Sequence, residues 1–236
     1  MKLLVVIPTY NEATNIAVLV PRLFKWIPGA SVLVVDDGSP DGTAQVVREL
    51  KEVYAALHLI ERGAKTGLGS AYREGFAWGL AKGFDSLVEM DADLSHRVRD
   101  LAMMLQAKNP GVDLVIGSRW MPGGAISNWS KGREMLSRSA NRYVQFALNL
   151  GVRDATSGFR IYSAEILRRI TGITSEGYSF QIEMTRAVRK LGGAITEVPI
   201  TFRERSSGVS KMSKAIVIEA MSLVTLWGLQ RLLRIK

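Results

Sequence analysis

The chain contains no cysteine and only two histidines, His58 and His96. The absence of cysteine excludes disulfides, thiolate nucleophiles and cysteine-bound zinc, and it fits a reducing compartment. Two imidazoles are also too few for a histidine-rich metal centre. Any metal site in this chain must therefore be built from carboxylates and other oxygen ligands.

Long hydrophobic runs are absent as well. The first apolar stretch, Leu3–Ile7, has five residues and is too short for a secretory signal peptide, so we expect the chain to start at its mature N-terminus. Near the other end, Ala220–Gln230 is an uncharged window of eleven residues, whereas a helix that spans a bilayer needs about 20. The sequence therefore predicts no membrane-spanning helix.

Acidic residues are fewer than basic ones: 22 Asp and Glu stand against 31 Lys and Arg, which gives a net charge of +9. This charge indicates anionic partners, a class that includes nucleic acids, phosphorylated substrates and acidic membrane surfaces. The basic residues concentrate between Arg186 and Lys214 and again at the end of the chain. Because no nucleic-acid-binding motif is found, we expect no nucleic-acid partner.

Apolar runs alternate with helical patterns along the first half of the chain. Runs that stop at turn residues predict strands at 3–7, 32–35, 57–60, 87–90 and 114–116, and helical patterns lie near 15–26, 70–82 and 100–108. This alternation is typical of an α/β fold with a mostly parallel central sheet and helices on both faces. Pro21 lies inside the first helical pattern, where we expect it to kink or shorten the helix.

The second half of the chain begins with a loop rich in glycine and tryptophan at 121–132. Helical patterns follow at about 134–150 and 180–191, then a strand at 195–202 and a last helix at about 214–233. No linker divides the chain convincingly. We therefore expect one catalytic domain over residues 1–213, followed by a C-terminal helix over residues 214–236.

Asp91-Ala92-Asp93 directly follows the apolar run that predicts the fourth strand. Residues i and i+2 of a strand project to the same face, so a strand that ends here can direct two carboxylates to one point. Two like charges are costly to bring together unless a cation or a proton intervenes. Mg²⁺ bound by carboxylates often completes its shell with substrate phosphates, so the triplet indicates a phosphate-bearing substrate.

Polar residues also follow three other predicted strands, at Pro8–Glu12, Asp36-Asp37 and Gly117–Arg119. In a parallel α/β sheet, ligands bind beyond the carboxyl ends of the strands. We therefore expect these segments and the aspartate pair to share one edge of the sheet.

Two common nucleotide-binding motifs are not met. The segment 63–67 ends like a P-loop, but Ala64 and Leu59 stand where that motif requires glycine. No G-x-G-x-x-G follows the first strand, which argues against a Rossmann oxidoreductase.

The segments Val6–Glu12, Val34–Thr43, Met90–His96 and Ile116–Arg119 together resemble an inverting family 2 glycosyltransferase with the GT-A fold. Two later segments, Gly177–Glu183 and Gly208–Met212, resemble the dolichyl-phosphate (polyprenyl-phosphate) mannose synthases in particular. The resemblance extends to about residue 214. It implies mannose transfer from GDP-mannose to dolichyl or polyprenyl phosphate, which gives a β-linked product.

The resemblance also implies roles for individual residues. The residues implied to bind the nucleotide sugar are Pro8, Tyr10, Glu12, Asp36, Asp37 and Ala92. Asp91 and Asp93 would hold Mg²⁺ or Mn²⁺, and Ser95 stands where some relatives carry a glutamine ligand, so either Ser95 or water would complete the shell.

The phosphate groups have their own implied residues. Arg119, Arg133 and Ser137 match positions that contact the donor diphosphate or the acceptor phosphate. Arg205 and Lys211 match a basic loop that closes over the phosphates.

Two other functions remain open from the residues alone. A UDP-sugar-dependent transferase that makes polyprenyl-phosphate glucose would use the same diphosphate machinery. A membrane-associated subunit with the fold but without catalysis would need neither the aspartate pair nor the basic loop, so their presence argues against it.

The last helical pattern is amphipathic. A polar stripe of Glu219, Ser222, Gln230 and Arg234 opposes a wide apolar face, and basic residues follow at the end of the chain. Such a helix suits a membrane interface or docking onto a small membrane subunit, and it equally suits packing on the protein's own core. The resemblance implies a cytoplasmic protein, peripheral on the cytosolic face of a membrane.

Overall fold

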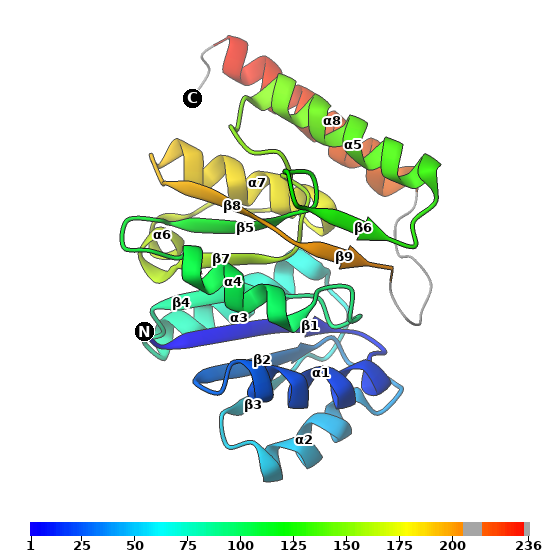
Figure 1. Cartoon of the computed structure of the whole chain (residues 1–236), viewed down its shortest axis with the longest axis vertical. Coiled ribbons are helices and arrows are strands. Elements are labelled where there is room, and N and C mark those ends of the chain that lie inside the picture. Colours follow the sequence, from blue (N-terminus) through cyan, green and yellow to red (C-terminus); the bar gives the residue numbers. More distant parts are fainter. Residues whose placement is uncertain (205–213, 234–236) are drawn as a thin grey trace.

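The computed structural model describes residues 1–204 and 214–233. A seven-stranded sheet with the order β3-β2-β1-β4-β7-β5-β8 forms its centre (Figure 1). In chain order its strands are β1 Leu3–Thr9, β2 Ala30–Asp36, β3 Leu57–Glu61, β4 Ser86–Glu89, β5 Leu114–Ser118, β7 Arg160–Ser163 and β8 Ile195–Pro199. A separate two-stranded sheet pairs β6 Ala125–Ser127 with β9 Thr201–Arg203.

The main sheet is mostly parallel, as the alternation of strands and helices predicts. β1 runs parallel to β2 and β4, β2 to β3, and β5 to β8. β7 is the exception, because it lies antiparallel between β4 and β5. The sequence analysis does not predict β7, whose four residues begin with a buried charge, Arg160, instead of an apolar run.

Helices cover both faces of the sheet. They are α1 Ala13–Trp26, α2 Thr43–Val53, α3 Leu68–Ala81, α4 Val98–Ala107, α5 Lys131–Leu148, α6 Ala164–Arg169, α7 Gly177–Lys190 and α8 Lys214–Leu232. Alternate residues of β1 enter two different cores. Leu4 belongs to the core that includes residues of α3, α5, α6, α7 and α8, whereas Val5 belongs to the core that includes residues of α1, α2 and α4. This division follows from the two-residue period of a strand.

One expectation about the first helices is wrong, and one further helix is not predicted. Pro21 does not shorten α1, which runs through it to Trp26. Burial of the apolar face of α1, which includes Ile16, Leu19 and Leu23, offsets the hydrogen bond that proline removes. The sequence pattern does not indicate α2, because only two of its residues, Thr43 and Val47, are buried.

The single strand expected at 195–202 is two strands. β8 pairs with β5 in the main sheet, and β9 pairs with β6 in the small one. Between them, the N–H of Ile200 donates to the carbonyl of Ser118 at 3.1 Å. The chain therefore leaves the main sheet at the end of β8, beside the end of β5. It then pairs with β6, which lies just before Trp129.

Helix α8 lies beside α5 and also contacts α7 (Figure 1). Val224 and Trp227 are buried on its inner side, and the Tyr143 and Thr225 hydroxyls are 2.6 Å apart between α8 and α5. Among the described residues, no helix is both long and apolar enough to span a membrane. The expected domain boundary after residue 213 borders the gap at 205–213 and stays a prediction.

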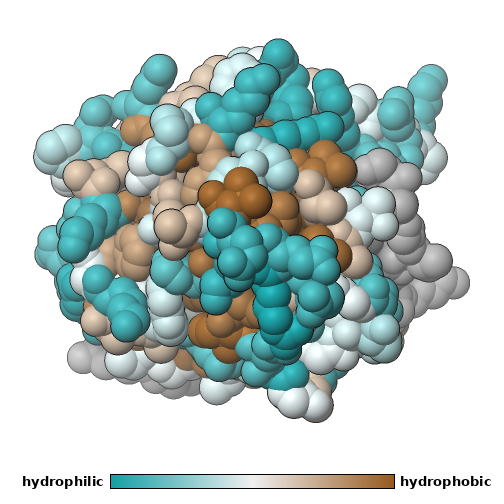
Figure 2. Space-filling model, turned by 90° about the horizontal axis from the view of Figure 1, so that it is seen from below, coloured by the Kyte–Doolittle hydropathy of each residue, from teal (hydrophilic) through white to brown (hydrophobic). Residues whose placement is uncertain are grey.

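Seen from below, the end of the molecule that carries β3 and α2 shows mainly hydrophilic side chains, with hydrophobic ones in separate patches between them (Figure 2).

Candidate active site

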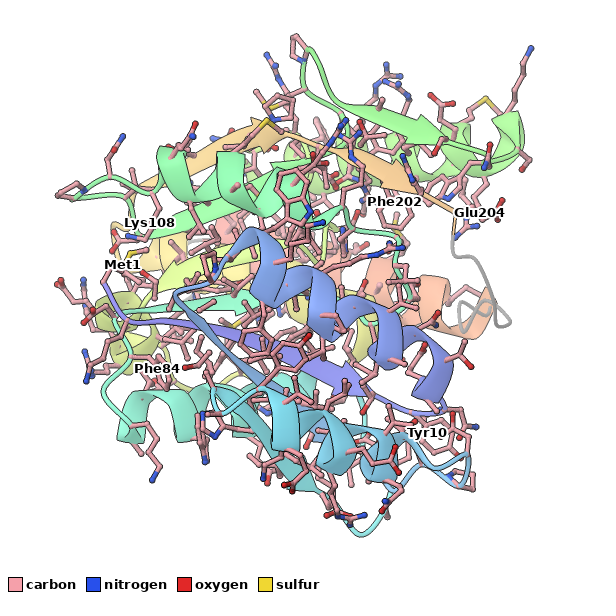
Figure 3. All side chains as sticks on the ribbon, turned by 60° about the horizontal axis from the view of Figure 1, so that its bottom comes forward. Met1, Tyr10, Phe84, Lys108, Phe202 and Glu204 are labelled. Atoms are coloured by element: carbon pink, nitrogen blue, oxygen red, sulfur yellow. The ribbon has the colours of Figure 1, made fainter. Side chains whose placement is uncertain are left out.

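The predicted site residues gather at one end of the sheet. Thr9 of β1 pairs with Asp36 of β2, and through β7 the residue Glu89 of β4 is level with Ile116 of β5. The segments after β1, β2, β4 and β5 therefore leave the sheet at the same edge, as the sequence analysis expects. Figure 3 shows Tyr10, Phe202 and Glu204 at this end and Met1, Phe84 and Lys108 at the other.

Asp36 fixes the loop after β2. Its side chain is buried and accepts hydrogen bonds from the Thr9 hydroxyl at 2.8 Å and from the Ser39 N–H at 2.9 Å. The hydroxyl of Ser39 also donates to it, at 2.5 Å. Asp36 thus stabilises the loop after β2, and its carboxylate accepts hydrogen bonds from protein donors.

Asp37, the next residue, has a cationic partner. Arg62 Nη1 donates to Asp37 Oδ1 at 2.8 Å, and both side chains are largely buried. Burial raises the pKa of Asp37 above its ordinary value, while the Arg62 guanidinium acts in the opposite direction. The sequence analysis does not identify Arg62, because its partner is 25 residues away.

The segment after β1 forms the neighbouring wall. The Lys65 ammonium lies 4.3 Å from the centre of the Tyr10 ring, and Asn15 Nδ2 donates to Glu12 Oε2 at 2.6 Å. Pro8 lies within β1, opposite Val35. The N–H of Asp37 donates to the carbonyl of Thr9 at 3.0 Å, which joins the segment after β1 to the segment after β2.

Asp41 anchors the start of two helices next to this wall. Its carboxylate accepts hydrogen bonds from the N–H groups of Ala13 at the start of α1 and Thr43 at the start of α2, each at 3.0 Å. Partial burial acts to raise the pKa of Asp41, but the hydrogen bonds from Thr43 and Ala13 outweigh it and lower that pKa. The sequence analysis does not identify this double cap.

Asp91, Ala92 and Asp93 lie in the loop after β4, because the strand already ends at Glu89. The expectation that the strand itself carries both carboxylates is therefore wrong: both lie in the loop, in which Leu94 has a φ of 62°. Ala92 and Asp93 are buried, whereas the Asp91 side chain is 35% exposed. The N–H of Ser95 donates to Asp93 Oδ1 at 3.1 Å.

The donor set of this loop fits a hard divalent cation. Carboxylate oxygens are the preferred ligands of Mg²⁺ and Mn²⁺. The Ser95 hydroxyl is buried and has no hydrogen-bond partner among residues 1–204 and 214–233, so it is one further oxygen in the same loop. In those residues no group of three or more His, Asp or Glu side chains is placed to hold a metal. The protein therefore offers two carboxylates, and other ligands must complete a shell.

His96 is the nearest imidazole. Its Nε2 lies 3.4 Å from Asp91 Oδ2, and its ring packs on Phe159 and against the edge of Phe202. The backbone N–H of Arg203 donates to the carbonyl of Ser95 at 3.0 Å. These contacts attach β9 to the aspartate loop.

Arg119 is held by an acid that the sequence analysis does not identify. Arg119 Nε and Nη2 each donate to the Asp154 carboxylate at 2.7 Å, and Nη2 also donates to the Thr156 hydroxyl at 2.8 Å. Burial acts to raise the pKa of Asp154, but Arg119 outweighs it and lowers that pKa. Arg119 is therefore a paired arginine with a fixed orientation.

One aromatic ring, that of Trp129, lies near both Arg119 and Arg133. The Arg133 guanidinium stacks 4.1 Å from the centre of the Trp129 ring, and that of Arg119 lies 5.8 Å from the same ring. Arg133 Nη1 also donates to Glu204 at 2.9 Å.

Ser137 lies one turn after Arg133 on α5. Its carbonyl accepts from Asn141 Nδ2 at 3.1 Å, and the same amide group donates to the Thr156 hydroxyl at 3.0 Å. Since Thr156 also contacts Arg119, the three residues proposed for phosphate contact belong to one connected region. Arg205 and Lys211 lie outside the described residues, in the stretch that follows Glu204.

Comparison with known proteins identifies the family. The family model described as "Glycosyl transferase family 2" matches residues 4–171. The chain belongs to glycosyl transferase family 2.

Two relatives of this family 2 glycosyltransferase confirm the narrower resemblance. The chain is 47% identical over 230 residues to polyprenol monophosphomannose synthase from Mycolicibacterium smegmatis, covering 96% of this chain and 87% of the relative. It is also 47% identical over 231 residues to undecaprenyl-phosphate mannosyltransferase from Micrococcus luteus, covering 97% and 95%.

The fold class is confirmed by a solved structure. Mannosyltransferase PcManGT from Pyrobaculum calidifontis, in complex with GDP-Man and Mn²⁺, superposes with a TM-score of 0.64 at 20% identity. The match covers all of this chain and 65% of that one.

A buried acid lies behind the aspartate loop of this family 2 glycosyltransferase. Glu89 is fully buried two residues before Asp91, and burial raises its pKa to about 7, although Arg160 acts in the opposite direction. Arg160 is also fully buried and donates to the carbonyls of Ala155 and Ser157, each at 2.7 Å. The sequence gives no clear signal for this pair, because Glu89 sits inside an apolar run.

Proposed function

We propose that this family 2 glycosyltransferase transfers mannose from GDP-mannose to dolichyl or polyprenyl phosphate with inversion at the anomeric carbon. The main structural support is that three groups of residues lie at one edge of the sheet. They are the loop with Asp91 and Asp93, the segments that carry Tyr10 and Asp37, and the region of Arg119 and Arg133. The names of the two relatives support mannose as the sugar and a polyprenyl phosphate as the acceptor.

The donor would bind over the ends of β1 and β2. Tyr10 and Glu12 would line the nucleoside pocket with Pro8 and Ala92, and Asp37 would accept hydrogen bonds from the base or ribose. Asp36 would act beneath them by holding the loop in shape.

Asp91 and Asp93 would hold Mg²⁺ or Mn²⁺, with Ser95 or water as a further ligand. When bound, the cation stabilises the negative charge that develops on the leaving diphosphate. The partly exposed Asp91 would hold the ion on the side open to the donor, while the more buried Asp93 accepts a hydrogen bond from the Ser95 N–H.

The acceptor phosphate would be oriented by Arg119, Arg133 and Ser137. One of its oxygens forms a bond to the anomeric carbon of mannose, and the bond from that carbon to the diphosphate breaks, so GDP leaves. Because a phosphate is already anionic at neutral pH, no strong general base is required. The arginines reduce the repulsion between the two anionic groups. Arg205 and Lys211 are proposed to close over them.

Membrane association would rest on the outer face of α5 and α8. Eight large hydrophobic side chains on these helices or directly after α8 are exposed: Met135, Leu136, Phe146, Ile218, Leu226, Leu229, Leu232 and Leu233. We call this set the apolar outer face. An exposed apolar layer of this kind suits a position in the interface of a membrane, on its cytosolic side. A small membrane subunit is the other occupant that the sequence analysis allows.

A transfer assay tests the proposal. Purified protein would be incubated in detergent with radiolabelled GDP-mannose and a polyprenyl phosphate, with Mg²⁺, with Mn²⁺ or with EDTA. We expect label in the lipid fraction only when a divalent cation is present. A parallel arm uses UDP-glucose. Labelling from UDP-glucose alone would change the substrate, and labelling from neither donor would contradict the proposal.

A further inference from the structure

An open groove of about 800 Å³ lies along α5, outside the candidate active site. Its walls come from α5, from the residue after Arg119 and from the loop that precedes β7. The lining residues that matter here are Trp120, Arg138, Arg142, Phe146, Arg153 and Glu197. None of them belongs to the proposed donor, metal or acceptor residues.

The groove carries excess positive charge. Arg138 pairs with Glu134 at 2.9 Å and stacks over Trp120 at 4.4 Å. Arg142 and Arg153 are exposed, and neither has an ion-pair partner in the described part of the chain.

The acid that lines the groove offsets only part of this charge. Glu197 accepts hydrogen bonds from the backbone N–H groups of Arg153 at 2.8 Å and Asp154 at 3.0 Å. It contributes one negative charge against the two positive charges of Arg142 and Arg153, so the groove keeps a net positive charge that can attract an anion.

An apolar surface borders this charge. Phe146 lines the groove and is 85% exposed, and it also belongs to the apolar outer face of α5 and α8. The indole N–H of Trp120 is buried and has no hydrogen-bond acceptor within residues 1–204 and 214–233. The groove thus combines cations with a neighbouring surface that water solvates poorly.

We propose that this groove binds the phosphate group of an anionic membrane phospholipid, with Arg142 and Arg153 as its ligands. Guanidinium groups bind phosphate oxygens with charge-assisted hydrogen bonds. Phe146 lies at the boundary between headgroups and acyl chains. A free phosphate would use the same two arginines but would gain nothing from Phe146 or from the apolar outer face. This inference rests on the proposed membrane-associated function.

Vesicle cosedimentation tests the inference. The full chain would be mixed with vesicles of phosphatidylcholine alone or with about 30 mol % phosphatidylglycerol, neither containing polyprenyl phosphate. The test variant is Arg142→Gln/Arg153→Gln. The matched control is Arg22→Gln/Arg168→Gln, which changes the net charge equally at exposed arginines of α1 and α6.

We expect the wild type to bind the anionic vesicles more tightly than the neutral ones. The groove variant should lose roughly 10- to 30-fold in affinity for anionic vesicles, because each basic residue near such a surface contributes about 1 kcal/mol. The affinity of the control variant for anionic vesicles should fall by less than about threefold. All three proteins should transfer mannose equally in detergent, which separates a failure of this inference from a failure of the proposed function.

Two results would overturn the inference. Equal losses in both variants would mean that net charge alone drives binding, and equal binding of the wild type to both vesicles would mean that no anionic lipid is recognised. Inorganic phosphate is added as a third arm. If it binds the wild type as tightly as the anionic vesicles do, the site takes a free anion and the lipid assignment is wrong.

Discussion

Asp154 holds Arg119 with both carboxylate oxygens, and a third hydrogen bond reaches the Arg119 backbone N–H at 2.9 Å. Asp154 is fully buried, so this pair is shielded from solvent. The arrangement fixes a guanidinium at the end of β5, beside Trp129 and Arg133. In the proposed mechanism Asp154 is a positioning residue, because it acts on phosphate only through Arg119.

Replacing Asp154 tests this role. Asp154→Asn should destabilise the fold by about 3 kcal/mol, because Arg119 is left buried without its counter-charge. At a temperature where the variant stays folded, we expect KM for polyprenyl phosphate to rise by about tenfold or more, with a much smaller change for GDP-mannose.

The control for this variant is a carboxylate directly before β5. Asp113→Asn changes a carboxylate at the other end of β5, where it accepts from Ser163 and Ala194. It should leave both KM values unchanged. Equal effects of Asp113→Asn and Asp154→Asn on acceptor KM would refute the positioning role.

The aspartate loop is tested by a charge-removing variant. Asp91→Asn should lower kcat by about 100-fold or more, because the cation that offsets charge on the leaving diphosphate loses a ligand. Mn²⁺ titration by isothermal calorimetry in the presence of GDP should show weaker binding. Asp85→Asn, at the opposite end of β4, is the matched control and should behave as the wild type. Near-normal turnover of Asp91→Asn would exclude the metal assignment.

Glu89 should make stability depend on pH. Its folded pKa of about 7 lies above its ordinary value of 4.5, so the folded state holds the proton more tightly than the unfolded state does. The resulting contribution is complete below about pH 4.5 and is lost as pH rises through about 7. It amounts to a few kcal/mol.

Denaturant titrations in the presence of EDTA, at pH values from about 4.5 to about 7, measure how stability depends on pH. The free energy of unfolding of Glu89→Gln should fall less with rising pH than that of the wild type, because glutamine does not titrate. Glu52→Gln, at an exposed position of α2, should keep the wild-type slope. An unchanged slope in Glu89→Gln would show that this carboxyl is not the titrating group.

Asp41 should matter for stability more than an exposed residue usually does. Asp41→Ala removes the acceptor for the first N–H groups of α1 and α2, and loss of a cap commonly costs about 1 kcal/mol each. We expect a loss of roughly 2 kcal/mol in thermal or denaturant unfolding at pH 7. Glu52→Ala provides the surface control. A loss no larger than that of Glu52→Ala would mean that the caps contribute little.

The sequence alone predicts which edge of the sheet carries the candidate site and which residues follow the strands there. Apolar runs before Asp36, Asp91 and Arg119 mark strands whose carboxyl ends must meet if the sheet is parallel. β7 could not be predicted in this way, because its central position depends on pairing with two strands that are distant in sequence. Its first residue, Arg160, is a charge that only the folded core satisfies.

The partners of the site residues were harder to predict than the residues themselves. Asp154 lies 35 positions after Arg119, and no local spacing links them. Glu89 was included in a strand but not recognised as a buried acid, because a single sequence does not tell which face of a central strand is covered. The groove beside α5 is not predictable from a single sequence either, because Arg142 and Arg153 line the same groove only through the fold.

The central claim is inverting mannosyl transfer to a lipid phosphate, and the structure of the product tests it most directly. Product made from GDP-mannose and polyprenyl phosphate would be purified and its anomeric configuration determined by NMR. The account predicts mannose attached to the lipid phosphate through a β linkage. An α linkage, or mannose found only as free sugar, would contradict it.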